Sequence, residues 1–318
     1  MLDVDLFIVA HGAQWSRLRA LTAQRRLTGS QVDELVALYR VVSAQLARAQ
    51  EAHLDDATVA MLASLVFSAR LRITRVRAGV WDTLRDFAIR DVPAAMYSAR
   101  RWWGGVALAF LLVAASMAIW VETSPGARSA AIGDRSLEEY AGPGGDFERY
   151  YSEHPATFFG AHVWTNNAWV GVLALFTGVL IVPSVWVLFT NAMQLGLSGA
   201  VMSEAGRLDV FFYYILPHGM LELSCIFLAG AAGLRMGMAA LAPGNRTRRA
   251  ALTEAGRSGL LVAVGLIPFF FIAAAVEAFV TPSGLPNVIR MVLGGCALSM
   301  LVAYVFLVGR RASESPGS

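Results

Sequence analysis

The stretch FFYYILPHGMLELSCIFLAGAAGLRMG, residues 211–237, decides the fold class of this chain. Most of it is apolar, and it is longer than the roughly 20 residues that a helix needs to cross a bilayer. Pro217, His218 and Glu222 nevertheless lie inside it. Ionisable groups in a membrane segment are costly, so they normally face the protein interior or a wet cavity. The stretch therefore predicts a membrane helix with a functional polar site.

The composition extends this prediction to most of the chain. Apolar residues make up 56% of the 318 residues and charged residues only 15%, with a mean hydropathy of +0.54. Soluble domains carry about 25% charged residues. We therefore expect an all-α, polytopic membrane protein with six transmembrane helices. Their apolar runs are 104–121, 168–189, 191–206, 210–234, 259–281 and 288–309, the fifth of which contains Glu277.

The distribution of arginine predicts the topology, including the role of the short run 191–206. Residues 1–101 hold fourteen Arg, and loop 235–258 holds five Arg and one acid, whereas loop 122–167 holds seven acids and three Arg. The two basic segments should be cytoplasmic and the acidic loop extracytoplasmic. That arrangement requires 191–206 to cross, and a five-span model with this run re-entrant is the alternative. We expect a multi-pass protein of the plasma membrane with both termini, including tail 310–318, in the cytoplasm.

The chain before the first apolar run has helical periodicity. Residues 1–79 predict a cytoplasmic helical domain, whose second helix starts at a cap formed by Ser30 with Asp33. Residues 80–103 are amphipathic, which indicates either a helix lying on the membrane surface or a further helix of the soluble domain. The sequence pI of about 9.1 does not indicate nucleic-acid binding, because the arginines gather beside membrane segments.

Several strings together resemble the stage II sporulation protein M family of bacterial and archaeal membrane proteins. They cover about residues 150–309 and are specific in combination, although each is weak alone. The strings are WTNNAW at 164–169, Asn191, LPHGMLE at 216–222, AGAAGLRMG at 229–237 and VEAFVTP at 276–282.

This resemblance implies a role in the cell envelope. In endospore formers the family member is associated with septal peptidoglycan remodelling, together with a cell-wall hydrolase and an amidase. The long N-terminal domain resembles the longer actinobacterial form, in which sporulation itself need not apply. The partners that the resemblance implies are envelope proteins, and we expect a homo-oligomer in the lipid bilayer.

The candidate site consists of Pro217, His218, Glu222 and Glu277. His218 and Glu222 are four residues apart and share a helix face, while Pro217 should kink that helix. His218, Glu222 and Glu277 together have three alternative interpretations: a packing cluster, a proton relay or a set of three metal ligands. We expect the packing cluster, with no metal or cofactor, and we expect His218 to lie closer to Glu277 than Glu222 does. No catalytic motif accompanies these residues, so we expect no enzyme activity.

Two further groups of residues are candidates for helix contacts. Three asparagines bracket the predicted second span and are more typical of helix caps than of bonds between helices. Three glycines give one helix a small-residue face, which permits close packing within the chain or between protomers. The asparagines are Asn166, Asn167 and Asn191, and the glycines are Gly230, Gly233 and Gly237.

We expect a non-enzymatic membrane scaffold that organises envelope or peptidoglycan-remodelling partners, as the resemblance implies. The alternative is a permease or exporter-like unit that moves a small solute or lipid past the polar residues. A sealed contact between His218, Glu222 and Glu277 favours the scaffold, and a continuous cavity beside them favours the permease.

Overall fold

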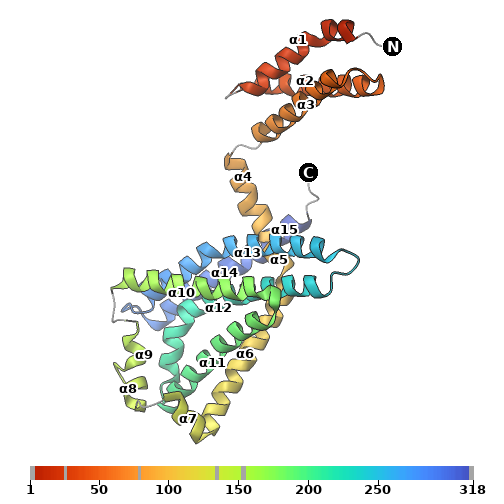
Figure 1. The fold of residues 1–318 in the computed structure, drawn as a ribbon. Coiled ribbons are helices and arrows are strands. Elements are labelled where there is room, and N and C mark those ends of the chain that lie inside the picture. The colour runs from red at the N-terminus through yellow and green to blue at the C-terminus, as the bar shows by residue number, and fades with distance from the viewer. Residues whose placement is uncertain (1–3, 25–26, 78–79, 133–135, 152–154, 315–318) are drawn as a thin grey trace. The chain divides into compact units, whose positions relative to one another are not determined.

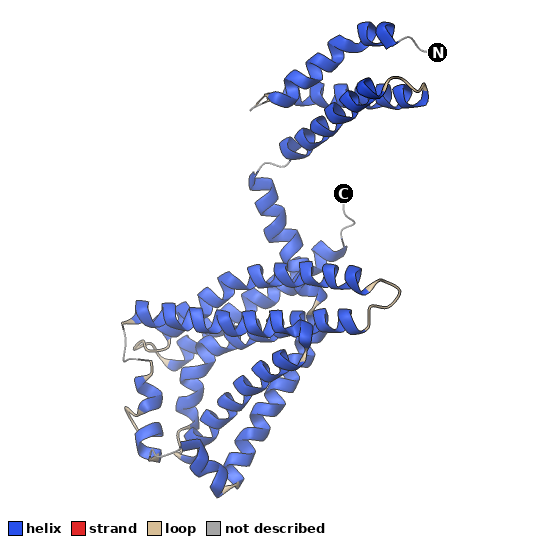
Figure 2. Cartoon of the chain, in the orientation of Figure 1, coloured by secondary structure: helices blue, strands red, loops and turns tan. Residues whose placement is uncertain are grey.

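The computed structural model describes residues 4–24, 27–77, 80–132, 136–151 and 155–314. Every regular element within these ranges is a helix, and none is a strand (Figure 1, Figure 2). This confirms the predicted all-α class. The chain divides into two compact units, Met1–Arg85 and Asp86–Ser318.

The first unit contains α1 (Val4–Ala23), α2 (Gly29–Glu51) and α3 (Asp56–Arg77), and α4 (Val80–Asp86) follows at its boundary. The first three helices contact one another and enclose a core of their own. Its most deeply buried side chains are Leu18, Leu21, Leu35, Val42 and Leu62.

Side chains cap the starts of α2 and α3. Thr28 forms a capping box with Gln31, whose Oε1 accepts from the Thr28 backbone N–H at 2.9 Å. The prediction that Ser30 and Asp33 cap this helix is wrong, because both lie inside α2. A backbone N–H three residues further on donates to Asp55 at the start of α3, and this bond holds the pKa of Asp55 below its usual value.

Among its described residues, the second unit contains six long helices that are apolar enough to cross a membrane, as the sequence predicts. A seventh helix of comparable length and composition, Asp56–Thr74, belongs to the first unit. Three of the six continue into short 3-10 or π-helical turns. They are α6 (Arg100–Thr123), α10 (Ala156–Phe176) with η2 (Thr177–Leu180), α11 (Val182–Glu204), α12 (Leu208–Leu241), α13 (Arg248–Ala275) with η3 (Val276–Val280), and α14 (Asn287–Ala303) with η4 (Tyr304–Val308) and α15 (Gly309–Glu314).

These six helices alternate in direction between two ends. The cap end carries α7 (Pro125–Ile132) and the cap, which we define as residues 137–151 and which contains α8 (Leu137–Ala141) and α9 (Asp146–Arg149). The opposite end, called the hairpin end, carries Ile181 and the loop 242–247. Contacts fix these assignments, because Arg207 donates to a cap carbonyl, whereas Gly237 lies against Gly178.

The break between the second and third membrane helices lies earlier than the sequence indicated. The predicted runs 168–189 and 191–206 meet at residue 190, whereas in the structure α10 and η2 end at Leu180 and α11 begins at Val182. Ile181 between them has φ 62° and ψ −63°, a strained turn conformation for a β-branched residue. The third helix is therefore a full-length one of 23 residues rather than a short one.

The amphipathic segment 80–103 is divided in the structure. After α4 come η1 (Phe87–Asp91) and α5 (Val92–Ser98), and α6 then begins. The side chains of α5 pack into the second unit, with Met96 fully buried and Val92 lying against Gly265 of α13. Residues 92–98 therefore belong to the core of the second unit instead of forming a surface helix.

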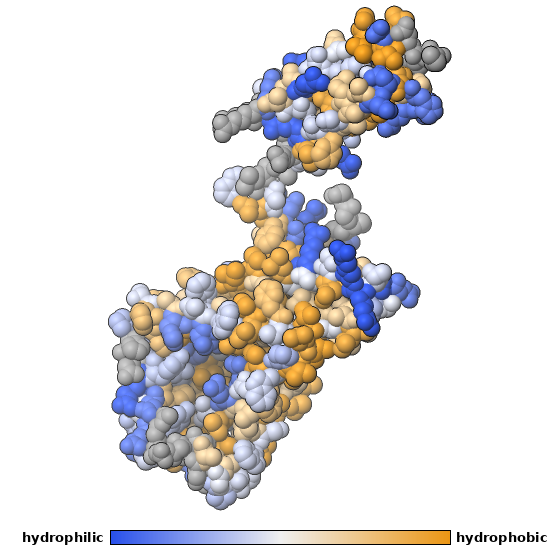
Figure 3. All heavy atoms as spheres, viewed as in Figure 1, coloured by the Kyte–Doolittle hydropathy of each residue, from blue (hydrophilic) through white to orange (hydrophobic). Residues whose placement is uncertain are grey.

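Apolar side chains remain exposed over the membrane helices. Figure 3 shows hydrophobic residues covering much of the visible face of the second unit, whereas hydrophilic residues gather over the cap. Such an exposed apolar surface is typical of a protein embedded in lipid. Its most exposed large members include Leu108, Trp120, Phe158, Trp169, Leu180 and Phe271.

Candidate functional site

The candidate site is built on a bend in α12. Pro217 lies inside this helix, removes one backbone donor and clashes with the preceding turn, which kinks a helix. Figure 1 shows α12 changing direction part-way along its length. A neighbouring helix, α14, packs against the bend. Its Gly294 lies directly against the Pro217 backbone, with no room for a side chain.

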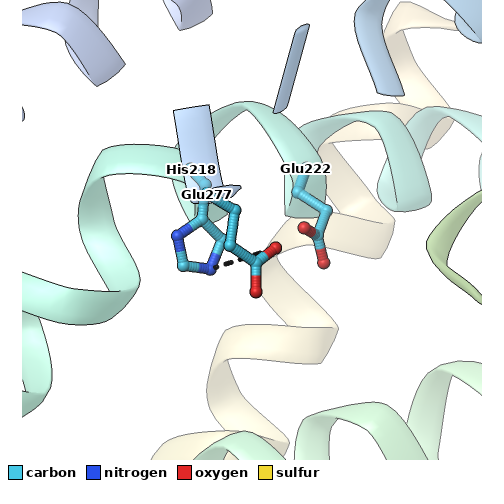
Figure 4. A group of neighbouring side chains, drawn as sticks. All are labelled: His218, Glu222 and Glu277. Carbon is cyan, nitrogen blue, oxygen red and sulfur yellow. Dashed lines mark ion pairs between the residues drawn. The ribbon is translucent and has the colours of Figure 1, made fainter. Parts of the chain in front are cut away.

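His218 and Glu222 follow the bend on one face of α12, and Glu277 reaches them from a neighbouring helix. Glu277 lies in η3, where the backbone N–H of Thr281 donates to the Val276 carbonyl at 2.9 Å. Such five-residue π-helical turns often occur at functional sites. The Nε2 atom of His218 lies 3.8 Å from Oε2 of Glu277, and Figure 4 shows the three side chains converging.

The three side chains form a compact and buried cluster. One ligand atom from each lies within 4.8 Å of the others. His218 is 5% exposed and Glu277 is 4% exposed, while Glu222 is half-buried. Oε2 of Glu222 and Oε2 of Glu277 have no hydrogen-bond partner in the part of the chain that the structure describes. Unsatisfied buried carboxylate oxygens are rare and need an explanation.

Second contacts orient the cluster. Nδ1 of His218 lies 3.3 Å from Oγ1 of Thr281, and Thr281 Oγ1 in turn donates to the Val276 carbonyl at 3.4 Å. The Thr281 carbonyl accepts from Arg290 at 2.8 Å, which fixes this turn. The Asn167 side chain of α10 lines the same cavity as Glu222. His218 is therefore held by Thr281, whereas Glu222 faces the polar wall of the cavity.

The three asparagines lie inside helices and are not helix caps. Asn166 and Asn167 belong to the middle of α10, where the Asn166 amide donates to Asn167 Oδ1 at 3.2 Å. Asn191 lies inside α11 and donates to the Val187 carbonyl at 2.8 Å. The hydropathy pattern suggested caps because it started the second membrane helix at residue 168, twelve residues after the true start of α10 at Ala156.

The cluster lies at the base of a polar cavity of about 680 Å³. The charged residues of its wall are Asp146, Glu222 and Glu277, and the described wall residues include no arginine. The neutral polar groups come from α10, α11 and the cap. They are Tyr140, Tyr150, Tyr151, Asn167, Asn191, Gln194 and Ser198.

The cap is attached to the membrane helices by specific bonds. Arg207, in the turn between α11 and α12, donates to the Ala141 carbonyl at 2.6 Å and pairs with Glu148. The Tyr140 hydroxyl lies 3.3 Å from Ser198 Oγ on α11. These bonds hold an acidic and aromatic segment over the cavity.

Aromatic packing continues from the cap down to the cluster. Phe147 packs against Phe211 and Tyr214 of α12 in tilted and edge-on arrangements, and the Tyr151 ring centroid lies 6.1 Å from that of His218. Burial raises the pKa of the Tyr151 phenol well above its usual value, and the charge of Glu277 adds to this. Tyr151 therefore presents a neutral hydroxyl group beside the cluster.

The three glycines make contacts within the chain. Gly233 has no room for a side chain, because a Cβ atom would lie 2.5 Å from the carbonyl oxygens of Ala174 and Leu175. Gly237 lies against Gly178 near the same turn, and a Cβ atom on Gly230 would lie 2.9 Å from Leu188. This small-residue face is occupied by α10, η2 and α11.

Sequence reasoning found the cluster but missed most of the cavity wall. Asn191, Gln194 and Ser198 share one face of α11 at spacings of three and four residues, and this spacing was a usable signal. The cap residues Tyr140 and Phe147 had no comparable signal, because only tertiary contacts bring them to the cavity.

The second unit is thus a polytopic helical membrane protein with a buried His/Glu cluster below a capped cavity. Residues 106–282, more than half of the chain, match the family model described as Stage II sporulation protein M. The chain belongs to this family. Residues 5–75 of the first unit match a model described as a domain of unknown function, DUF8413. No curated protein and no solved structure matches the chain.

Proposed function

We propose that the protein is a membrane-embedded permease unit that admits a small polar or cationic solute to His218, Glu222 and Glu277. The cavity of about 680 Å³ that these three residues line is the observation that carries the proposal. Ionisable residues within membrane segments that border a wet cavity commonly mark solute or proton pathways. The acidic wall favours a cation or a neutral polar solute over an anion.

A solute could pass beyond the three residues toward the hairpin end only if helices move. On the hairpin side of Glu222, Gly230 and Gly233 pack closely against α10 and α11. The described conformation is therefore closed toward the hairpin end. The bend of α12 and the π-helical turn at η3 are the two irregular points beside the cavity, and we propose that they absorb this motion.

Water access to the cavity provides the first test. Ser198→Cys should react with a membrane-impermeant, cationic thiol reagent in a Cys296→Ser background, whereas the native Cys225, which is fully buried, should not. Mass spectrometry of the labelled protein distinguishes the two sites. If Ser198→Cys is as unreactive as Cys225, the cavity is not accessible and the permease proposal fails.

Flux provides the second test. Proteoliposomes that contain a pH-sensitive dye should dissipate an imposed proton gradient faster with the unmodified protein than with Glu277→Gln. Glu204→Gln is the matched control, because Glu204 is exposed at the end of α11 and does not line the cavity. Equal rates in all three preparations would argue against proton movement through the cluster.

We also propose the orientation that the arginine distribution predicts, with the cap end outside the plasma membrane and both termini in the cytoplasm. Ala130 and Asn245 are exposed on the cap side and in the 242–247 loop. In cells, an impermeant thiol reagent should label Ala130→Cys and miss Asn245→Cys. Labelling of Asn245→Cys from outside would reverse the orientation.

A second candidate is a non-enzymatic scaffold for cell-envelope or peptidoglycan-remodelling partners. Membership of the stage II sporulation protein M family supports it. The first unit also has its own core and exposes Leu6, Val9 and Phe67, each more than 60% exposed. Photo-crosslinking residues placed at Val9 and Glu138 should capture envelope proteins or a second copy of the chain in cells. The scaffold proposal loses its support if both positions yield no crosslink.

A further inference from the structure

We propose that His218, Glu222 and Glu277 bind a divalent transition-metal cation at the base of the cavity. This inference deepens the proposed function by naming the class of ligand, and it rests on that function only in assuming that the ion enters through the cavity.

The geometry of the cluster is close to that of a metal site. One nitrogen and two carboxylate oxygens lie within 4.8 Å of one another. Around a tetrahedral zinc ion, with bonds of about 2.0–2.2 Å, the same atoms would be about 3.4 Å apart. Side-chain shifts of about 1 Å would close this difference. Three protein ligands beside a cavity leave a fourth position open for water or solute.

The orientation of the imidazole supports a cation between the side chains. When Thr281 Oγ1 donates to the Val276 carbonyl, 3.4 Å away, its lone pairs are free to accept from Nδ1 of His218 at 3.3 Å. In that arrangement the proton of a neutral imidazole is on Nδ1. Nε2 then turns its lone pair toward Oε2 of Glu277, 3.8 Å away. A histidine that ligates a metal through one nitrogen usually donates from the other in this way.

The charge and burial of the cluster also favour a bound cation. Oε2 of Glu277 and Oε2 of Glu222 lack hydrogen-bond partners among the described residues, and Glu277 is 4% exposed. Two carboxylates this close repel each other when both are ionised, so a proton or a cation must lie between them. The third charged residue of the wall, Asp146, pairs with Arg149, so the uncompensated negative charge of the wall is concentrated at Glu222 and Glu277. This charge attracts cations toward the cluster.

The ligand set indicates the kind of cation. Imidazole suits zinc and iron, whereas carboxylates also suit manganese and magnesium. A mixed set of one nitrogen and two oxygens favours zinc, iron or manganese over magnesium, which prefers oxygen ligands and keeps several waters. Zinc is the probe of choice, because its affinity for such sites is high and it has no redox chemistry.

The test is zinc binding to the full-length protein in lipid nanodiscs, measured by competition with a fluorescent zinc indicator. We expect one zinc ion per chain, and a loss of affinity of about tenfold or more in Glu277→Gln and Glu222→Gln. Glu204→Gln, a matched control outside the cavity wall, should bind like the unmodified protein. Absence of binding by the unmodified protein would overturn the inference, and so would unchanged binding by Glu277→Gln.

Thr281→Val keeps all three ligands and removes only the orienting hydroxyl group. It should lower zinc affinity by about 10- to 100-fold, so it tests the site even if Glu277→Gln does not fold. X-ray absorption should show only nitrogen and oxygen neighbours at about 2.0–2.2 Å. A sulfur neighbour at about 2.3 Å would assign the ion to Cys225 or Cys296 and overturn the proposed ligand set.

The outcome can separate this inference from the proposed function. Zinc binding together with an unreactive Ser198→Cys would retain the metal site and reject the open cavity. A reactive Ser198→Cys without zinc binding would retain the cavity and reject the metal site.

Discussion

The two halves of α12 differ although both are apolar. The first half, which runs from Phe211 to Ile226 and carries His218 and Glu222, borders a cavity. The second half, which carries Gly233, is packed against backbone atoms of α10. Glycine lets neighbouring backbones meet and leaves no space. In the first half, longer polar side chains and the aromatic cap surround an open volume. The size of side chains at the interface, rather than hydropathy, determines where the membrane domain is hollow.

The largest expected effect is on the packed half. Gly233→Ala should destabilise the protein by about 3 kcal/mol or more, because the new methyl group would meet two backbone carbonyl oxygens that cannot move aside. Thermal unfolding in one detergent measures the change. Gly295→Ala in α14 is the control, because nothing lies within 4 Å of a Cβ atom there. Equal unfolding midpoints for the two variants would refute the close contact.

The second prediction concerns the cap, which covers the cavity beside the first half of α12. Arg207→Ala should detach the cap at a cost of about 1–3 kcal/mol, because the Ala141 carbonyl and the Glu148 carboxylate both lose their donor. Hydrogen exchange of residues 137–151 should accelerate. Arg149→Ala, which removes an exposed ion pair inside α9, should change exchange little. Similar exchange in both variants would mean that Arg207 does not hold the cap.

The sequence predicted the six membrane helices of the second unit but not where each begins and ends. The run from 168 to 189 is continuously apolar, so the predicted second helix extends past Ile181, where the structure has a turn. Pro183, near the start of α11, was the available signal, because proline favours the first turn of a helix. Asn167 was placed outside the membrane because the apolar run begins at residue 168, although Asn167 lies inside α10 and lines the cavity together with Glu222.

The candidate site was predictable only where one helix or one string carried it. The spacing of His218 and Glu222 defined a shared face, and Glu277 stood out as an acid inside the apolar run 259–281 and the string VEAFVTP. The expected closer approach of His218 to Glu277 than of Glu222 remains a prediction. The cavity depends on how the cap folds back over α11 and α12, and no local pattern encodes that contact.

A smaller effect is expected within the cavity half. Glu222→Ala should cost about 1 kcal/mol, because it removes a half-buried carboxyl group from the polar wall of the cavity, where water can take its place. Glu204→Ala, at the exposed end of α11, should cost less. Unfolding midpoints of both variants at neutral pH provide the comparison. Equal midpoints would mean that Glu222 is solvated as fully as Glu204.

The smallest effect concerns alkaline pH. Because the pKa of Tyr151 is raised well above 10.0 by burial, the folded protein keeps this phenol protonated longer than the unfolded chain does. The stability that this provides is fully present below pH 10.0 and is lost as pH rises toward the folded pKa. Tyr151→Phe should therefore lose less stability between about pH 10 and pH 11 than the unmodified protein. Parallel losses would place Tyr151 in contact with bulk water.

The contact between Gly309 and Pro93 means that the chain enters and leaves the second unit at neighbouring points. The two ends of the membrane domain therefore lie next to each other. For this reason, the order of its helices along the chain can be changed without changing how they pack. A circular permutant that joins Glu314 to Asp86 through a short linker and opens the exposed loop 242–247 should keep the fold. We likewise expect that another domain can replace the first unit before α5 while the path of the membrane helices stays the same.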